Sequence, residues 1–163
     1  MKIFVTVGTT EFDKLIDTLS DSAIVDTLVG LGYSHMTMQI GRGIVEPMQI
    51  NHDKFTVDFF RYKNTIVEDI NAADLVISHA GAGSCLEVLS AQKPLIIVIN
   101  EDLMSNHQVE LAQKLFSEGY LLYCTCKTLL TLLSSMNLFV LKPFEASCTP
   151  VFAAFMDTAM EML

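Results

Sequence analysis

The sequence predicts an α/β fold, a Rossmann-like, mostly parallel sheet with helices on both faces. In the second half of the chain, apolar runs of strand length alternate with segments of helical periodicity, which implies right-handed βαβ units. The run Pro94–Ile99 is entirely apolar, as expected for a strand that is covered on both sides. Glycines follow several of these runs, where turns from strand to helix are expected.

The first half of the chain is expected to form strands and helices that end at glycines or polar links. The expected elements are a strand at 2–7, a helix with Phe12, Leu15, Ile16 and Leu19, a helix at 21–31, a strand at 33–40 and a strand at 55–62. Thr10 and Asp13 resemble a capping arrangement at the start of the first helix.

The second half is expected to alternate between helices and strands. The expected elements are helices at 65–73, 84–92, 106–118 and 128–136, and strands at 74–78, 94–99 and 121–126. No linker precedes Lys142 and Pro143. Residues 1–141 are therefore expected to form one domain, followed by a tail at 142–163.

The composition excludes several classes of protein. Nineteen acidic and ten basic residues give a formal net charge of −9, which argues against a nucleic-acid partner. The four cysteines lack zinc-ligand spacing, so neither a metal, a disulfide framework nor another cofactor is expected, and reduced thiols fit a cytoplasmic chain. No apolar run reaches the roughly 18 residues of a membrane span, so a soluble protein is expected.

The segment Ser78–Ser84 is the leading candidate for a binding site. It follows the apolar run Ala73–Ile77 and precedes a segment with apolar residues at helical spacing. Gly81 and Gly83 would let the backbone approach a ligand, and the free amides of the first helical turn would bind an anion such as a phosphate. The alternative is that the two glycines only form a tight turn.

Three loops are expected at the same edge of the sheet, because ligands of parallel sheets bind beyond the carboxyl ends of the strands. They are Gly8-Thr9-Thr10, His79–Ser84 and Asn100–Gln108. Their convergence is stronger support for a site than any one loop alone.

Common nucleotide and hydrolase motifs are missing from this edge. Leu86 stands where a dinucleotide fingerprint needs its third glycine. No Gly-Lys-Ser/Thr and no Gly-x-Ser-x-Gly occur, which removes the main support for ATP hydrolysis and for serine hydrolysis.

Four blocks resemble a known family. They are Val5–Thr10, Ala73–Glu87, Pro94–Asn100 and Asn106–Ala112, and the likeness extends over about the first 140 residues. The blocks resemble the cytosolic catalytic subunits of the UDP-N-acetylglucosamine transferase of dolichol-linked oligosaccharide synthesis, in glycosyltransferase family 28. That family is similar to the donor-binding half of the bacterial lipid II-forming N-acetylglucosaminyltransferase. The resemblance therefore implies the donor-binding half of a GT-B fold.

The resemblance also implies a role for each matching position. Gly8, Thr9 and Thr10 would approach the donor diphosphate, together with Gly81, Ala82, Gly83 and Ser84. Glu87 would bind the ribose hydroxyls, and Asn106, His107 and Gln108 would hold the transferred sugar. Tyr62 and Lys63 would lie against uracil, and His79 would have a positioning role.

Local interpretations remain open at three of these positions. Ser84 and Glu87 also have the spacing of a capping box, in which Glu87 would bond to the start of its helix. Ser105 and Gln108 have the same spacing. His79 would otherwise be a hydrogen-bonded core histidine.

The implied reaction is an inverting transfer of N-acetylglucosamine from UDP-N-acetylglucosamine to N-acetylglucosaminyl-diphosphodolichol. The length suits the donor half only, so a membrane-anchored partner subunit would supply the acceptor half, at the cytosolic face of the endoplasmic reticulum. Loop amides and helix N-termini, not a metal, would stabilise the leaving diphosphate. The general base is not identified. The alternatives are a non-catalytic nucleotide-sugar-binding or regulatory paralogue and a structural scaffold.

The tail is expected to contain an amphipathic helix. The apolar residues at helical spacing are Phe152, Phe155, Met156, Ala159 and Leu163. This stripe would pack either on the core of the chain or on the partner.

Overall fold

The structure, a computed structural model, describes residues 1–47, 52–103 and 106–145, with only the backbone described at positions 106 and 107. The apolar stripe expected in the tail lies outside the described residues. Among the described residues, no helix is both long and apolar enough to span a membrane.

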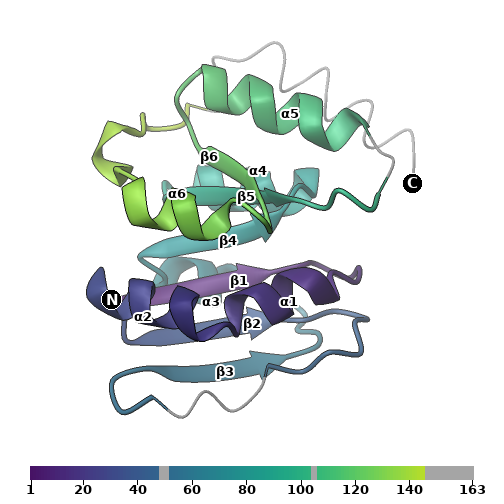
Figure 1. The fold of residues 1–163 in the computed structure, drawn as a ribbon. Helices are drawn as coiled ribbons and strands as arrows, with labels where there is room; N and C mark the ends of the chain where they lie inside the picture. The colour runs from purple at the N-terminus through teal and green to yellow at the C-terminus, as the bar shows by residue number, and fades with distance from the viewer. Residues whose placement is uncertain (48–51, 104–105, 146–163) are drawn as a thin grey trace.

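A six-stranded, entirely parallel sheet forms the centre of the protein (Figure 1). Its strands are β1 (Lys2–Thr6), β2 (His35–Gln39), β3 (Thr56–Phe60), β4 (Leu75–His79), β5 (Leu95–Ile99) and β6 (Leu122–Thr125). Their order is β3-β2-β1-β4-β5-β6, the doubly wound order of Rossmann folds. The predicted fold class is confirmed.

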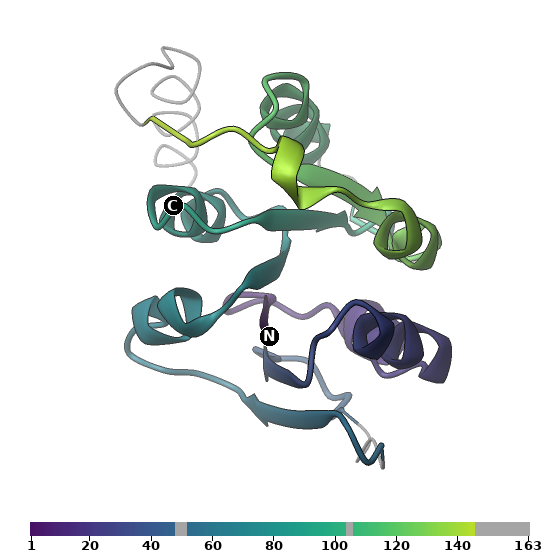
Figure 2. The ribbon, with the colours of Figure 1, turned by 90° about the vertical axis from the view of Figure 1, so that its left-hand side faces the viewer.

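Helices cover both faces of this sheet (Figure 2). They are α1 (Asp13–Leu19), α2 (Ser22–Gly30), α3 (Val67–Ala72), α4 (Ala82–Ser90), α5 (Asn106–Ser117) and α6 (Leu129–Ser135), with a 3₁₀ turn at Leu138–Val140. The first two helices and α6 share one core, whereas α3, α4 and α5 share the other. Every residue of β5 is buried, as its continuous apolar sequence predicts.

The predicted cap of α1 is wrong. No side chain caps this helix, and the Thr10 hydroxyl donates to the Val7 carbonyl at 2.8 Å instead. The Asp13 carboxylate accepts from the backbone N–H groups of Ile44 and Val45, at 3.2 and 3.3 Å. Asp13 therefore ties α1 to the loop after β2, a contact 31 residues away in sequence that local spacing does not reveal.

The loops that follow β1 and β2 are joined at the carboxyl edge of the sheet. The Arg42 N–H donates to the Thr10 carbonyl at 2.9 Å, and its Nε donates to the Thr9 carbonyl at 3.0 Å. Gly41 has a φ of +58°, and a Cβ on it would collide with the Thr10 carbonyl oxygen. A side chain at this position would therefore separate the two loops.

Residues 142–145 pack at the opposite end of the sheet, beside the turns that lead into β5 and β6. The Gln92 side chain both donates to the Phe144 carbonyl, at 2.6 Å, and accepts from the Phe144 N–H, at 3.1 Å. Phe144 is buried in the core that α3, α4 and α5 share. Gln92 holds this contact from a left-handed backbone conformation, with a φ of +57°.

We predict that Gly41→Ala lowers the free energy of unfolding by at least about 2 kcal/mol, because alanine would be strained at positive φ and would strike the Thr10 carbonyl. Denaturant unfolding measures this change. The control is Gly30→Ala at the end of α2, where a Cβ meets open space and a gain of about 0.5 to 1 kcal/mol is expected. Equal stability of the two variants would contradict the loop contact.

Candidate donor-binding cleft

A cleft of about 580 Å³ opens where β1 and β4 lie side by side. From this pair of strands the chain winds outward in both directions, which makes their carboxyl ends the switch point where doubly wound sheets bind ligands. The lining residues are Gly8, Thr9, Thr10, Gln39, Lys63, Asn64, Thr65, Ile66, His79, Gly81, Gly83, Ser84 and Glu87. The loops after β1 and β4 therefore meet as the sequence predicts.

The third expected loop, Asn100–Gln108, contributes none of its described residues to the lining of this cleft. Gln108 does not line this cleft, and the side chains of Asn106 and His107 lie outside the described residues. Ser105, the other half of the suggested capping pair with Gln108, lies outside them as well.

The N-terminus of α4 points donors toward the cleft. The helix begins at Ala82, two residues earlier than predicted, with Gly81 as its N-cap residue. Its first intrahelical donor is Cys85, whose N–H bonds to the Gly81 carbonyl at 3.0 Å. The preceding amides, from Ala82 to Ser84, are the free donors of a first helical turn. With the helix dipole they form a site of positive potential that suits an anion.

The two glycines of this loop differ in what surrounds them. A Cβ on Gly81 would stand 2.5 Å from Nε2 of His79, so Gly81 makes room for the imidazole. A Cβ on Gly83 would have no atom within 4 Å. Since no protein contact requires a glycine at position 83, its open face leaves space for a ligand beside the helix.

His79 ends β4 and separates the two glycine loops. A Cβ on Gly8 would stand 3.1 Å from its Cε1, opposite the close approach to Gly81. Nδ1 lies 3.4 Å from the Thr6 carbonyl, which can only accept, so this nitrogen bears the proton in that contact and Nε2 is left as an acceptor. Burial lowers the pKa of His79, although the Thr6 carbonyl opposes this effect, and the ring is neutral at pH 7.

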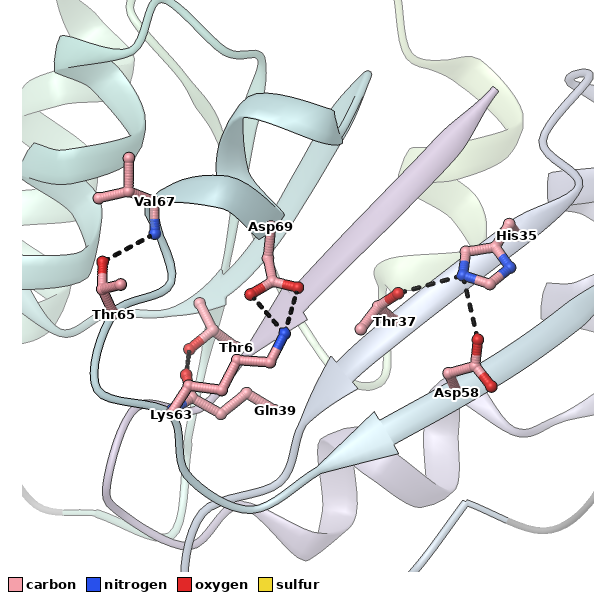
Figure 3. Close-up of polar contacts among 9 residues, drawn as sticks. All are labelled: Thr6, His35, Thr37, Gln39, Asp58, Lys63, Thr65, Val67 and Asp69. Carbon is pink, nitrogen blue, oxygen red and sulfur yellow. Dashed lines mark hydrogen bonds and ion pairs between the residues drawn. The ribbon is translucent and has the colours of Figure 1, made fainter.

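A row of buried polar side chains lies at the carboxyl ends of three strands, and one of them, Gln39, lines the cleft. Gln39, Thr6 and Ser78 are register partners across β2, β1 and β4, with exposures of 4%, 0% and 0%. The Thr6 hydroxyl donates to Oε1 of Gln39 at 2.6 Å (Figure 3). Ser78 donates to the neighbouring carbonyl of His79 at 2.9 Å. Gln39 was not predicted as a site residue, although its place at the end of a strand before Gly41 was a usable signal.

The segment after β3 forms one wall. Lys63 is held there by Asp69, with Nζ 2.7 Å from a carboxylate oxygen (Figure 3). Nζ also lies 4.0 Å from the centre of the Phe60 ring. Tyr62, which was predicted to lie against uracil together with Lys63, is 51% exposed and does not line the cleft. Asn64, Thr65 and Ile66 do line it, although sequence reasoning missed them.

Glu87 is available for a ligand. The capping-box interpretation is wrong, because α4 begins before Ser84 and has no side-chain cap. Glu87 instead lines the cleft from the interior of the helix. In the described part of the chain, no hydrogen bond or ion pair engages its carboxylate. It can therefore accept hydrogen bonds from ligand hydroxyl groups.

Neighbouring groups give no sign of metal or thiol chemistry. Within the described ranges, no group of three or more His, Cys, Asp or Glu side chains is arranged to hold a metal ion. Cys85 is buried behind the cleft, and burial raises the pKa of its thiol to about 12, so the thiol stays protonated.

Two solved structures that are similar to this chain are those of ALG13 and of a MurG protein. An NMR structure of ALG13 has a TM-score of 0.72 at 29% identity and is matched over 93% of this chain and 92% of its own. MurG of Acinetobacter baumannii has a TM-score of 0.67 at 22% identity, with 86% of this chain matching 42% of the enzyme. The second likeness concerns the fold alone, and it covers less than half of that enzyme. The fold is thus the Rossmann-like fold of GT-B glycosyltransferases.

Sequence comparison assigns the family. The glycosyltransferase family 28 C-terminal domain matches residues 2–161, and the chain belongs to this family. The human UDP-N-acetylglucosamine transferase subunit ALG13 is 56% identical over 127 residues, and the mouse protein is 54% identical over 128. These matches cover 78% of this chain but only 11% of either relative. The subunit of the same name from Saccharomyces cerevisiae is 32% identical, over 92% of this chain and 91% of its own.

We predict that Gly83→Ala raises the free energy of unfolding by about 0.5 to 1 kcal/mol, because alanine favours the helix and finds open space. Gly81→Ala should lower it by about 1 to 3 kcal/mol, because the new methyl group would displace the His79 ring. Denaturant unfolding of both variants tests the two roles. A stabilising Gly81→Ala would contradict the packing described for His79.

We predict that acidification destabilises the protein through His79. Its folded pKa lies below the unfolded value of 6.5, so the unfolded chain binds more protons in that interval and stability falls as the pH drops below about 7. Melting temperatures from pH 8 to pH 5 should fall less steeply in His79→Gln than in the wild type. His52→Gln controls for removal of a histidine elsewhere, and parallel wild-type and His79→Gln curves would contradict the burial effect.

Proposed function

We propose that this chain is the donor-binding subunit of an N-acetylglucosaminyltransferase and binds UDP-N-acetylglucosamine in the cleft at the switch point. The main support is the free Glu87 carboxylate on the same helix whose N-terminal amides face the cleft. A carboxylate suits ribose hydroxyls, and amides suit a diphosphate. The relatives named as UDP-N-acetylglucosamine transferase subunits support the same donor.

The proposed donor lies with its diphosphate between the loop Gly8-Thr9-Thr10 and the residues 81–84. Glu87 accepts from the ribose hydroxyls, and the wall at Lys63 lies beside the uracil. Tyr62, which precedes Lys63, remains a proposed contact of the base although it does not line the cleft. Asn106, His107 and Gln108 remain the proposed contacts of the transferred sugar.

The proposed acceptor is N-acetylglucosaminyl-diphosphodolichol, in line with the resemblance of the four sequence blocks. Its hydroxyl oxygen attacks the anomeric carbon opposite the UDP, so that the bond from that carbon to the diphosphate oxygen breaks with inversion. The electron pair of this bond passes to UDP, and the amides and dipole of α4 stabilise the new charge. The proton of the attacking hydroxyl passes to a general base, which we do not assign to this chain. Donor binding and leaving-group stabilisation are the roles that we assign to it.

A membrane-anchored partner subunit completes the proposed enzyme at the cytosolic face of the endoplasmic reticulum. The supporting observation is that relatives of this chain are named as subunits of a UDP-N-acetylglucosamine transferase. We propose residues 1–141 as the donor domain and 142–163 as a tail through which the partner docks.

We predict that Glu87→Ala lowers the affinity for UDP about tenfold or more, because it removes a charged acceptor from the ribose hydroxyls. Calorimetry with UDP and its 2′,3′-dideoxy analogue separates this contact from general damage. The wild type should prefer UDP, and Glu87→Ala should bind the two ligands alike. Asp17→Ala, which removes an exposed carboxylate from α1, is the matched control.

Transfer requires a separate assay. The chain, the anchored partner, UDP-N-acetylglucosamine and the dolichyl acceptor should together yield the disaccharide product. Donor binding without transfer under these conditions would contradict the catalytic role and favour a regulatory subunit. No UDP binding at all would contradict both and leave a scaffold.

A further inference from the structure

Gln39 is a buried polar residue of the cleft to which the proposed donor contacts give no role. It is the last residue of β2, is only 4% exposed and lines the cleft. A buried amide group normally has partners for both its oxygen and its nitrogen. In the described residues, only its oxygen end is engaged, by Thr6.

A short chain of hydrogen bonds determines which end of the amide is engaged. The Gly8 N–H donates to the Thr6 hydroxyl oxygen at 3.0 Å. The hydroxyl of Thr6 then donates its own proton to Oε1 of Gln39 at 2.6 Å. With the amide reversed, the Thr6 hydroxyl oxygen would accept from both Gly8 and Nε2 of Gln39, and its own proton would lose the acceptor Oε1. The nitrogen Nε2 is therefore the end left for a ligand.

The surroundings of Nε2 indicate what it binds. Besides the Gln39 amide, the cleft offers the backbone N–H donors of the first turn of α4, whereas Nε2 of His79 is an acceptor in the same lining. A diphosphate carries only acceptor oxygens in its ionised form, and it therefore suits the donors of Gln39 and α4.

We propose that Nε2 of Gln39 donates a hydrogen bond to a diphosphate oxygen of the nucleotide, with Thr6 as the positioning residue that orients the amide. This assignment rests on the proposed donor site. It adds a contact from β2, so that the diphosphate is held from three neighbouring strands, β2, β1 and β4. It also gives a function to the row of buried polar side chains at the ends of these strands.

Two substitutions of Gln39 test the contact by calorimetry with UDP, UMP and uridine on the full chain. Gln39→Met removes the donor at similar size and should weaken UDP binding about tenfold while leaving uridine binding unchanged. Gln39→Glu still accepts from Thr6 but places a negative charge beside the diphosphate, so its loss should be larger. The control is Thr37→Val on the same strand, whose hydroxyl bonds to His35 and lies outside the cleft lining.

Substitutions of Thr6 test whether its hydroxyl orients the side-chain amide of Gln39, while they leave that amide in place. Thr6→Val removes the hydroxyl and should weaken UDP binding, whereas Thr6→Ser keeps the hydroxyl and should restore most of the affinity. Equal losses in Thr6→Val and Thr6→Ser would overturn the positioning role. Circular dichroism and melting curves establish that each variant is folded, and Gln39→Glu answers the question if Gln39→Met does not fold.

The remaining outcomes are distinct. Unchanged UDP affinity in folded Gln39→Met and Gln39→Glu would overturn the contact while the donor site stands. A loss that is equal for UDP and uridine would overturn a phosphate contact, as would a loss seen with UDP-N-acetylglucosamine but not with UDP. Failure of the wild type to bind UDP would overturn the proposed function itself, and this is measured before any variant.

Discussion

The approach of the His79 imidazole to two stretches of backbone determines the shape of the cleft. The ring lies between Gly8 and Gly81, where a Cβ on Gly81 would overlap it and a Cβ on Gly8 would press against it, and its Nδ1 meets the carbonyl of Thr6. The loops after β1 and β4 are therefore spaced by a rigid, neutral ring and not by their own flexibility. The direction of the first amides of α4, and with it the anion site, depends on this spacing.

The fold was predictable because its information is local. Apolar runs such as Pro94–Ile99 and the glycines after them suffice to place a parallel sheet and the loops at its carboxyl edge. Contacts between strands were not predictable in this way. Gln39 becomes a site residue through its register with Thr6, and Asp13 holds a distant loop in place of capping its own helix. Both depend on pairings that no spacing along the chain encodes.

The electrostatics of the cleft differ from those of the whole protein. The chain has a net charge of −9, yet its cleft offers donors that carry no formal charge: helix amides and a side-chain amide. Lys63 is the only lysine or arginine among the described residues that line the cleft, and it already forms an ion pair with Asp69. Local dipoles can bind an anion without a basic surface that would also attract unrelated polyanions.

The paired hydrogen bonds between Gln92 and Phe144 lie at the opposite end of the sheet from the cleft. They fasten the chain near the amino ends of β5 and β6, whereas the cleft opens at the carboxyl ends of β1 and β4. The contact therefore holds Phe144 at the end of the sheet that lies away from the cleft, and neither glycine loop takes part in it.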